Sequence, residues 1–119
     1  ENGSAGLKGG DGDDLLKGNA GHDDLDGGRG NDVLSGGFGA DRFTYGSGQD
    51  RIIDFQNEID TLVLDSALWG GGALSVSQLA TYVTQTTGGA ISLDFGNGNI
   101  LELSGVETVN VLNGDVEFV

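Results

Sequence analysis

Large apolar residues return every nine positions through the first half of the chain, each in the middle of a short segment between glycine-rich stretches. They are Leu7, Leu16, Leu25, Leu34, Phe43 and Ile52. In a β-strand successive side chains point to opposite faces, so a middle residue can face inward while its two neighbours face outward. The pattern therefore predicts three-residue strands with a buried middle side chain, at residues 15–17, 24–26, 33–35 and 42–44.

The segments between these strands repeat as well. From Gly9 onward, five ungapped copies of nine residues place glycine at the fourth position and aspartate at the sixth. The aspartates are Asp14, Asp23, Asp32, Asp41 and Asp50. A truncated copy precedes them, with Gly3 and Leu7 in register and Ala5 where the aspartate belongs. A fixed period over five copies indicates a repeat architecture in which each copy stacks on its neighbours.

This nonapeptide resembles the sequence Gly-Gly-x-Gly-x-Asp-x-U-x, with U a large apolar residue, of the repeats-in-toxin (RTX) family. The resemblance implies an all-β fold in which residues 1–53 form a calcium-binding parallel β-roll. Two nonapeptides make one turn of such a roll, and each contributes a six-residue loop and a three-residue strand. Loops this rich in glycine adopt positive φ without steric cost and can turn their carbonyls inward.

Consecutive copies fall on opposite edges of the roll, so the aspartates form two columns with a spacing of 18 residues. One column holds Asp14, Asp32 and Asp50, and the other holds Asp23 and Asp41, with position 5 lacking its carboxylate. Carboxylates at the strand spacing of about 4.8 Å repel each other by roughly 3 kcal/mol at an effective dielectric constant of about 20. A hard cation between the turns converts this repulsion into ligation. Ca²⁺, which accepts many oxygens in flexible geometry, suits such a site better than Mg²⁺.

The resemblance also implies the ligands, because in RTX proteins each ion lies between two stacked loops. One loop supplies carbonyls from its second and fourth residues, the next loop supplies carbonyls from its first and third residues, and both supply their aspartates. The first ligand set is then Gly10, Gly12, Asp14, Gly27, Arg29 and Asp32. The second ligand set is Asn19, Gly21, Asp23, Gly36, Phe38 and Asp41. The third ligand set is Gly28, Gly30, Asp32, Tyr45, Ser47 and Asp50, and here Tyr45 departs from the glycine of the repeat.

The segment from Asp50 to Leu62 resembles the exit of the roll in serralysin-type secreted proteases, where later aspartates help to close a last calcium site. This resemblance implies a fourth ligand set and a total of three to four calcium ions. The fourth ligand set is Gly37, Gly39, Asp41, Asp54 and Asp60. The alternative is that Asp54 and Asp60 only cap turns.

Residues 54–119 read as a β-rich C-terminal cap with one short helix that covers the open end of the coil. A buried strand is expected at residues 62–64, and the apolar spacing after Ser75 predicts a short amphipathic helix over 75–83. Residues 90–95 and 99–103 alternate about Gly96-Asn97-Gly98, which predicts a hairpin. Final strands are expected at 109–112 and 116–119.

Composition excludes several classes of function. Acidic residues outnumber basic ones by 19 to 5, and the formal net charge of −14 argues against nucleic-acid binding. The chain has 24 glycines. It has no cysteine, which excludes disulfides and thiol chemistry. It also has no apolar run long enough for a membrane span. The spacing after Asp11 does not fit an EF-hand. His22 is expected to be solvated rather than a zinc ligand or general base, and Trp69 to pack in the core or cap rather than to bind carbohydrate.

The last five residues, Asp115 to Val119, place an acidic residue before an apolar run and resemble the uncleaved type I secretion signal of RTX proteins. Together these patterns predict a non-enzymatic calcium-binding module that folds on export and supports the type I secretion and stability of a larger secreted, extracellular bacterial protein. Its partners would be calcium, the secretion machinery and a covalently attached N-terminal functional domain. One alternative is a polysaccharide- or surface-binding module of an extracellular epimerase or adhesin. Another is the tail of a lytic or proteolytic toxin.

Overall fold

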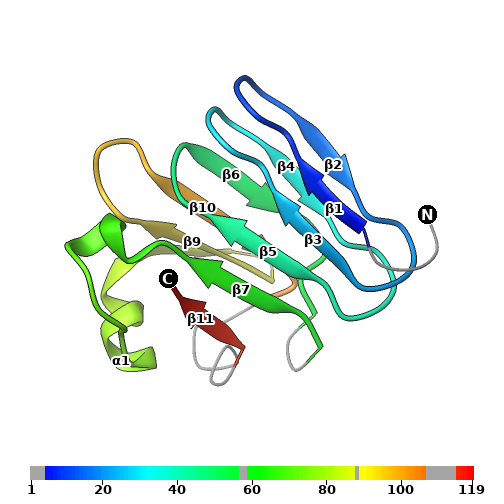
Figure 1. Ribbon diagram of the computed structural model, residues 1–119. Helices are drawn as coiled ribbons and strands as arrows, with labels where there is room; N and C mark the ends of the chain where they lie inside the picture. The colour runs from blue at the N-terminus through cyan, green and yellow to red at the C-terminus, as the bar shows by residue number, and fades with distance from the viewer. Residues whose placement is uncertain (1–4, 57–58, 88, 107–114) are drawn as a thin grey trace.

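The chain winds into two facing β-sheets built from short strands (Figure 1). The computed structural model describes residues 5–56, 59–87, 89–106 and 115–119. The first sheet has the order β1-β3-β5-β7-β11, with bounds Ala5–Lys8, Asp23–Asp26, Arg42–Tyr45, Thr61–Leu64 and Val116–Phe118. The second has the order β2-β4-β6-β10-β9-β8, with bounds Leu15–Lys17, Val33–Ser35, Gln49–Ile52, Ile100–Ser104, Ala90–Asp94 and Val83–Thr87.

The strands of the roll pair in parallel with a register of 18 residues. In the first sheet Leu7 lies beside Leu25, and Leu25 lies beside Phe43. In the second sheet Leu16 lies beside Leu34, and Leu34 lies beside Ile52. Among the strands of the repeats, β1, β3 and β5 lie in one sheet and β2, β4 and β6 in the other, so each pair of nonapeptides makes one turn. This confirms the parallel β-roll, and it confirms that Ala5 is the register partner of Asp23.

Both sheets continue beyond the repeats. Strand β7 pairs in parallel with β5 and then with β11, and β10 pairs in parallel with β6. Among the strands that the structure describes, only β9 and β8 add to the second sheet in the antiparallel direction. Between β7 and β8 the chain forms the 3₁₀ turn η1 (Ser66–Trp69), the single-turn helix α1 (Val76–Leu79) and the 3₁₀ turn η2 (Ala80–Tyr82). No helix in the described part of the chain is both long and apolar enough to cross a bilayer.

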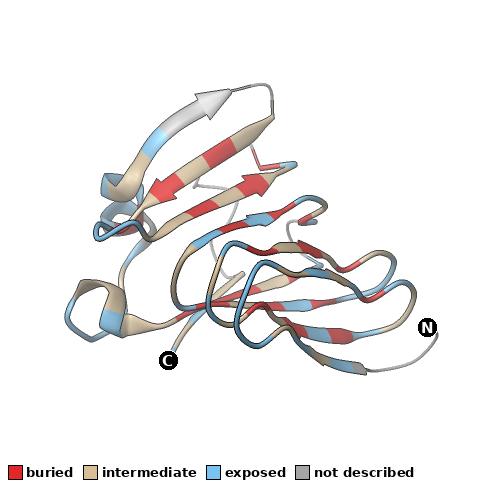
Figure 2. Cartoon of the chain, turned by 90° about the horizontal axis from the view of Figure 1, so that it is seen from above, coloured by how far each residue is buried: buried red, intermediate tan, exposed pale blue. Residues whose placement is uncertain are grey.

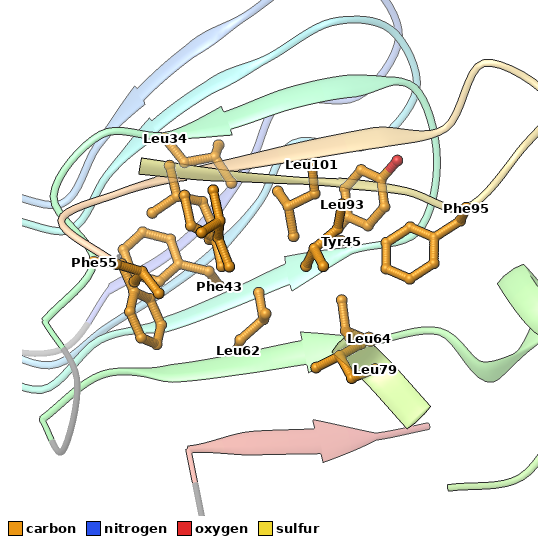
Figure 3. Packing of buried hydrophobic residues seen from close by; sticks show 14 of the residues in the cluster. Leu34, Phe43, Tyr45, Phe55, Leu62, Leu64, Leu79, Leu93, Phe95 and Leu101 are labelled. Atoms are coloured by element: carbon orange, nitrogen blue, oxygen red, sulfur yellow. The ribbon is translucent and has the colours of Figure 1, made fainter. Parts of the chain in front are cut away.

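One hydrophobic core fills the space between the sheets (Figures 2 and 3). The inward residues of the repeats form its first part, and Leu25, Phe43 and Ile52 are fully buried. Side chains from the strands beyond the repeats, including Leu62 and Leu101, continue the same cluster without a break. Leu7 and Leu16, on the first two strands, are only partly buried, because no further turn covers them among the described residues.

Most of the strands predicted from the sequence are confirmed, whereas the predicted helix differs in part. The strands of the repeats, the strand at 62–64 and the hairpin about Gly96-Asn97-Gly98 are confirmed. The helix begins as expected after Ser75, whose hydroxyl accepts a hydrogen bond from the N–H of Gln78 (3.2 Å), but it ends as a 3₁₀ turn at Tyr82. Strand β8 and the turn η1 were not predicted. The strand expected at 116–119 is β11, and the one expected at 109–112 lies outside the described residues.

Trp69 packs against other aromatic side chains near one end of the core, as expected. Its ring centroid lies 5.6 Å from that of Phe118 in an edge-on arrangement and 5.9 Å from that of Phe95. Its indole N–H donates to the carbonyl of Gly72 (2.8 Å). The side chain thereby joins η1 to the strand β11.

Candidate calcium sites

The sixth-position aspartates form two continuous hydrogen-bonded columns along the edges of the roll. On one edge the N–H of Asp14 donates to Oδ1 of Asp32, and the N–H of Asp32 donates to Oδ1 of Asp50, both at 2.9 Å. On the other edge the N–H of Asp23 donates to Oδ1 of Asp41, again at 2.9 Å. Asp32, Asp41 and Asp50 therefore each use one carboxylate oxygen to hold the turn before them, which fixes where the second oxygen lies.

In four of these five aspartates the Oδ2 oxygen is buried and has no hydrogen-bond partner. This holds for Oδ2 of Asp14, Asp23, Asp32 and Asp41, and also for Oδ1 of Asp23. Burying a carboxylate oxygen without a partner is costly, and native proteins avoid it unless a cation or proton compensates. The orphaned oxygens therefore fit a hard cation that prefers carboxylate and carbonyl ligands, which is the chemistry of Ca²⁺.

Burial raises the pKa of four carboxylates along the two edges, those of Asp32, Asp41, Asp50 and Asp60. The pKa of Asp50 rises to about 7 and that of Asp41 to about 6, chiefly because burial disfavours the charged form and secondarily because other aspartates lie nearby. The pKa values of Asp32 and Asp60 are raised for the same main reason. Without a cation, part of the column is thus stabilised by protons near neutral pH.

The glycine that begins each of the first four repeats leaves room for the carboxylate of the same repeat. A Cβ on Gly27 would lie 2.5 Å from Oδ2 of Asp32, and a Cβ on Gly9 would lie 2.6 Å from Oδ2 of Asp14. The carbonyl oxygen of Gly27 also comes within 2.7 Å of that point at Gly9. Oδ2 of Asp14 and the carbonyl oxygen of Gly27, both members of the first expected ligand set, therefore converge on one place in the structure.

The carbonyls of the loops point from one turn toward the next. The carbonyl of Gly10 faces Gly28, at 2.5 Å from where a Cβ would stand, and the carbonyl of Gly12 faces Gly30. On the other edge the carbonyls of Asn19 and Gly21 face Gly37 and Gly39, whose φ values are 79° and 100°. The space between stacked loops is thus lined by carbonyl oxygens from the expected second and fourth positions.

Other candidate ligands already take part in contacts. The carbonyl of Phe38 accepts a hydrogen bond from the N–H of Gly21 (3.1 Å), while the residue as a whole is 81% exposed. The carbonyl of Tyr45 accepts a hydrogen bond from the N–H of Asp65 (3.3 Å). Arg29 is exposed and Ser47 is half-buried, so each could contribute a carbonyl without burying a polar side chain.

Asp54 and Asp60 occupy different environments at the exit of the roll. Asp60 continues the column of Asp23 and Asp41, because its Oδ1 accepts from the N–H of Asp41 at 2.9 Å. The step from Asp41 to Asp60 is 19 residues, so one extra residue is accommodated in the loop. Asp54 instead accepts hydrogen bonds from the hydroxyl of Ser35 and from the N–H groups of Gly36 and Gly37, at 2.8 to 3.0 Å.

Two side chains outside the expected ligand sets, those of Asn99 and His22, accept hydrogen bonds from main-chain N–H groups of the loops. Oδ1 of Asn99 accepts from the N–H of Gly48 at 3.0 Å, and the N–H of Ile100 donates to the carbonyl of Gly48 at the same distance. His22 is exposed, and its Nδ1 accepts from the N–H of Ala40 (3.0 Å). The described residues contain no cluster of three or more His, Cys, Asp or Glu side chains that could hold a metal ion.

Comparison with known proteins agrees with this geometry. Residues 7–34 and 18–52 match the RTX calcium-binding nonapeptide repeat (4 copies), and these residues therefore consist of calcium-binding RTX repeats. The chain is also similar to the solution structure of the AlgE6R3 subunit from the Azotobacter vinelandii mannuronan C5-epimerase. The two share 29% sequence identity with a TM-score of 0.60, over 98% of this chain and 78% of the other. No match was found among curated protein sequences.

The fit between glycine and carboxylate gives a steric prediction. In Gly18→Ala the new methyl group would lie 2.8 Å from Cγ of Asp23, so the carboxylate must move. We expect a loss of stability on the order of 1–3 kcal/mol at saturating calcium, together with weaker calcium binding. Urea unfolding measures the loss of stability, and calorimetric titration measures the weaker calcium binding. Gly6→Ala is the matched control, since nothing lies within 4 Å of its Cβ position, and equal behaviour of the two variants would contradict the steric account.

The raised pKa values predict how calcium-free protein responds to pH. The folded state holds protons on Asp41 and Asp50 more tightly than the unfolded state, whose carboxyls have a pKa near the ordinary 3.8. The resulting stabilisation is full below about pH 4 and is lost as the pH rises to about 7, on the order of 4 kcal/mol for Asp50. Circular dichroism in calcium-free buffer should therefore show more folded protein at pH 4 than at pH 7.5. Asp50→Asn should flatten this dependence, and stability that rose with pH would refute it.

Proposed function

We propose that the chain is a non-catalytic module of a secreted, extracellular protein and that calcium drives its folding after export. The observation that carries this proposal is the pair of aspartate columns with buried oxygens that lack partners. Those carboxylates repel one another when the turns stack without a cation. Calcium ligation by the RTX repeats supplies the missing counter-charge, and folding and binding then become one event.

We assign the ions to the spaces between stacked loops. Three sets follow the regular register of the roll and share the two aspartate columns. The first is Gly10, Gly12, Asp14, Gly27, Arg29 and Asp32; the second is Asn19, Gly21, Asp23, Gly36, Phe38 and Asp41; the third is Gly28, Gly30, Asp32, Tyr45, Ser47 and Asp50. In the fourth, Gly37, Gly39, Asp41 and Asp60 are the better candidates, because the carboxylate of Asp54 already accepts three hydrogen bonds.

This arrangement suits a protein exported as an unfolded chain. Where calcium is scarce, as in the cytosol, repulsion between the aspartates of each column opposes folding. The chain then stays unfolded and can pass through a narrow type I secretion channel. Where calcium exceeds the dissociation constant of a site about tenfold, each occupied site contributes about 1.4 kcal/mol to folding. Because each turn of a repeat array packs only on its neighbours, filling one site orders the loops of the next.

A second candidate function is the binding of an extracellular polysaccharide. The similarity to a repeat module of a mannuronan C5-epimerase favours it. The outward side chains of the second sheet include Lys17 and Arg51, although Arg51 is paired with Glu102. Titration of the calcium-loaded chain with mannuronan separates the two candidates, because the folding function requires no glycan.

Calcium-dependent folding is tested by circular dichroism of the whole chain during a calcium titration, with magnesium as the control ion. We expect β-structure to appear cooperatively with calcium and not with equal magnesium. Asp32→Asn, which alters a ligand of two proposed sites, should weaken the response by roughly ten- to a hundredfold, whereas exposed Asp24→Asn should leave it nearly unchanged. A chain that is fully folded in the presence of a calcium chelator would contradict calcium-dependent folding.

The export role is tested by fusing the whole chain to a reporter in a bacterium with a type I secretion system. Residues 115–119 are expected to be required, since they resemble the secretion signal of RTX proteins. In the folded chain they form strand β11 and its flanks, and Arg42 pairs with Glu117 at 3.1 Å. Glu117→Gln, which removes only this ion pair, is the control for effects on folding. Undiminished export after deletion of 115–119 would refute the assignment of the signal.

A further inference from the structure

The fifth residue of each nonapeptide varies in type, yet its main-chain N–H makes a regular contact. The N–H of Asn31 donates to Oδ1 of Asp13 at 2.8 Å, and the N–H of Gln49 donates to Oδ1 of Asn31 at 2.9 Å. On the other edge the N–H of Ala40 donates to Nδ1 of His22 at 3.0 Å. The acceptor in each case is the fifth side chain of the repeat 18 residues earlier.

These bonds run in the opposite direction to those of the aspartate columns. Loop 27–32 is held to the preceding turn through the N–H of Asn31 and to the following turn through the N–H of Asp32. Loop 36–41 is held in the same way through the N–H groups of Ala40 and Asp41. Two consecutive N–H groups in each loop thus fix its position between both neighbours.

The planarity of the peptide bond links these contacts to the calcium ligands. In a trans peptide the N–H of the fifth residue and the C=O of the fourth lie in one plane and point in opposite directions. When the N–H of Asn31 points back to Asp13, the carbonyl of Gly30 must point forward. The structure agrees, because the carbonyl of Gly30 faces Gly48 of the next turn. Gly30 is a fourth-position ligand of the third proposed set.

We propose that the fifth-position side chains are positioning residues for calcium, each acting on a site between the two turns that follow it. Asp13 orients the carbonyl of Gly30 and so serves the third set, although Asp13 itself is exposed and belongs to no set. His22 orients the carbonyl of Gly39 and so serves the fourth set. This inference rests on the proposed calcium function and adds residues that the repeat pattern leaves open.

The acceptor atom, rather than the charge, is the feature that the inference requires. Asp13→Ala and Asp13→Asn remove the same charge, but only the asparagine keeps Oδ1. We expect Asp13→Ala to weaken calcium binding roughly fivefold, the equivalent of one hydrogen bond, and Asp13→Asn to restore it. Asp11→Ala is the control for charge, because Asp11 lies in the same loop, is exposed and makes no hydrogen bond among the described residues. Calorimetric calcium titration of the four proteins gives the comparison.

A double-mutant cycle then locates the affected site. Asp50 belongs only to the third set and Asp23 only to the second. If Asp13 acts on the third site, Asp13→Ala combined with Asp50→Asn should be less than additive in calcium affinity, and combined with Asp23→Asn it should be additive. Equal affinities of Asp13→Ala and Asp13→Asn, or additivity in both cycles, would overturn the inference. A wild-type chain that bound no calcium would instead overturn the proposed function.

Discussion

Buried negative charge at a fixed spacing is the constraint on which this structure depends. Strand pairing brings the sixth-position aspartates one turn apart. The main-chain N–H of an aspartate in one turn donates a hydrogen bond to a carboxylate oxygen of the aspartate in the next turn. Oδ2 of Asp14, Asp23, Asp32 and Asp41 is left buried and without a hydrogen-bond partner. A fold that repeats this arrangement on both edges needs a bound cation or bound protons to neutralise it.

Glycine is the counterpart of this constraint. The first glycine of a repeat makes space for a carboxylate, and the second and fourth glycines bring one loop's backbone against the carbonyls of its neighbour. A side chain at Gly28, Gly30, Gly37 or Gly39 would meet a main-chain carbonyl of the preceding turn and separate the two turns. The variable positions of the repeat are therefore those where the chain faces solvent, and at the exposed fifth position Asp13, His22 and Asn31 each accept a hydrogen bond from the main chain of a later turn.

The sequence made the repeats predictable because their information is local and periodic. Period, strand positions, inward residues and the pairing of Leu16 with Leu34 all follow from counting by nine and eighteen. Beyond residue 53 each contact is made once, so no repetition reveals it. The parallel pairing of β11 with β7 joins segments about fifty residues apart, and the bond from Gly48 to Asn99 joins the roll to a hairpin turn. Strand β8 was missed because its polar residues show no clear alternation.

The candidate site was predictable to a similar degree. The sixth-position aspartates were found from the pattern and lie together as expected. The position of Asp60 in the column could be anticipated only by analogy, since its spacing is 19 rather than 18 residues. The contacts of Asp54 with Ser35, Gly36 and Gly37 depend on how the chain leaves the roll, which periodicity does not specify.

The 18-residue register also determines how such a chain can change in length. One additional pair of nonapeptides would lengthen each sheet by a single strand and leave every later neighbour in place. One additional nonapeptide would exchange the two edges of the roll. Asn99 and Asp60 would then each lie beside a loop of the opposite edge, and their contacts with Gly48 and Asp41 would be lost. Roll domains of this kind can therefore grow or shrink by duplication and deletion in even numbers of repeats, while the segment after the roll stays the same.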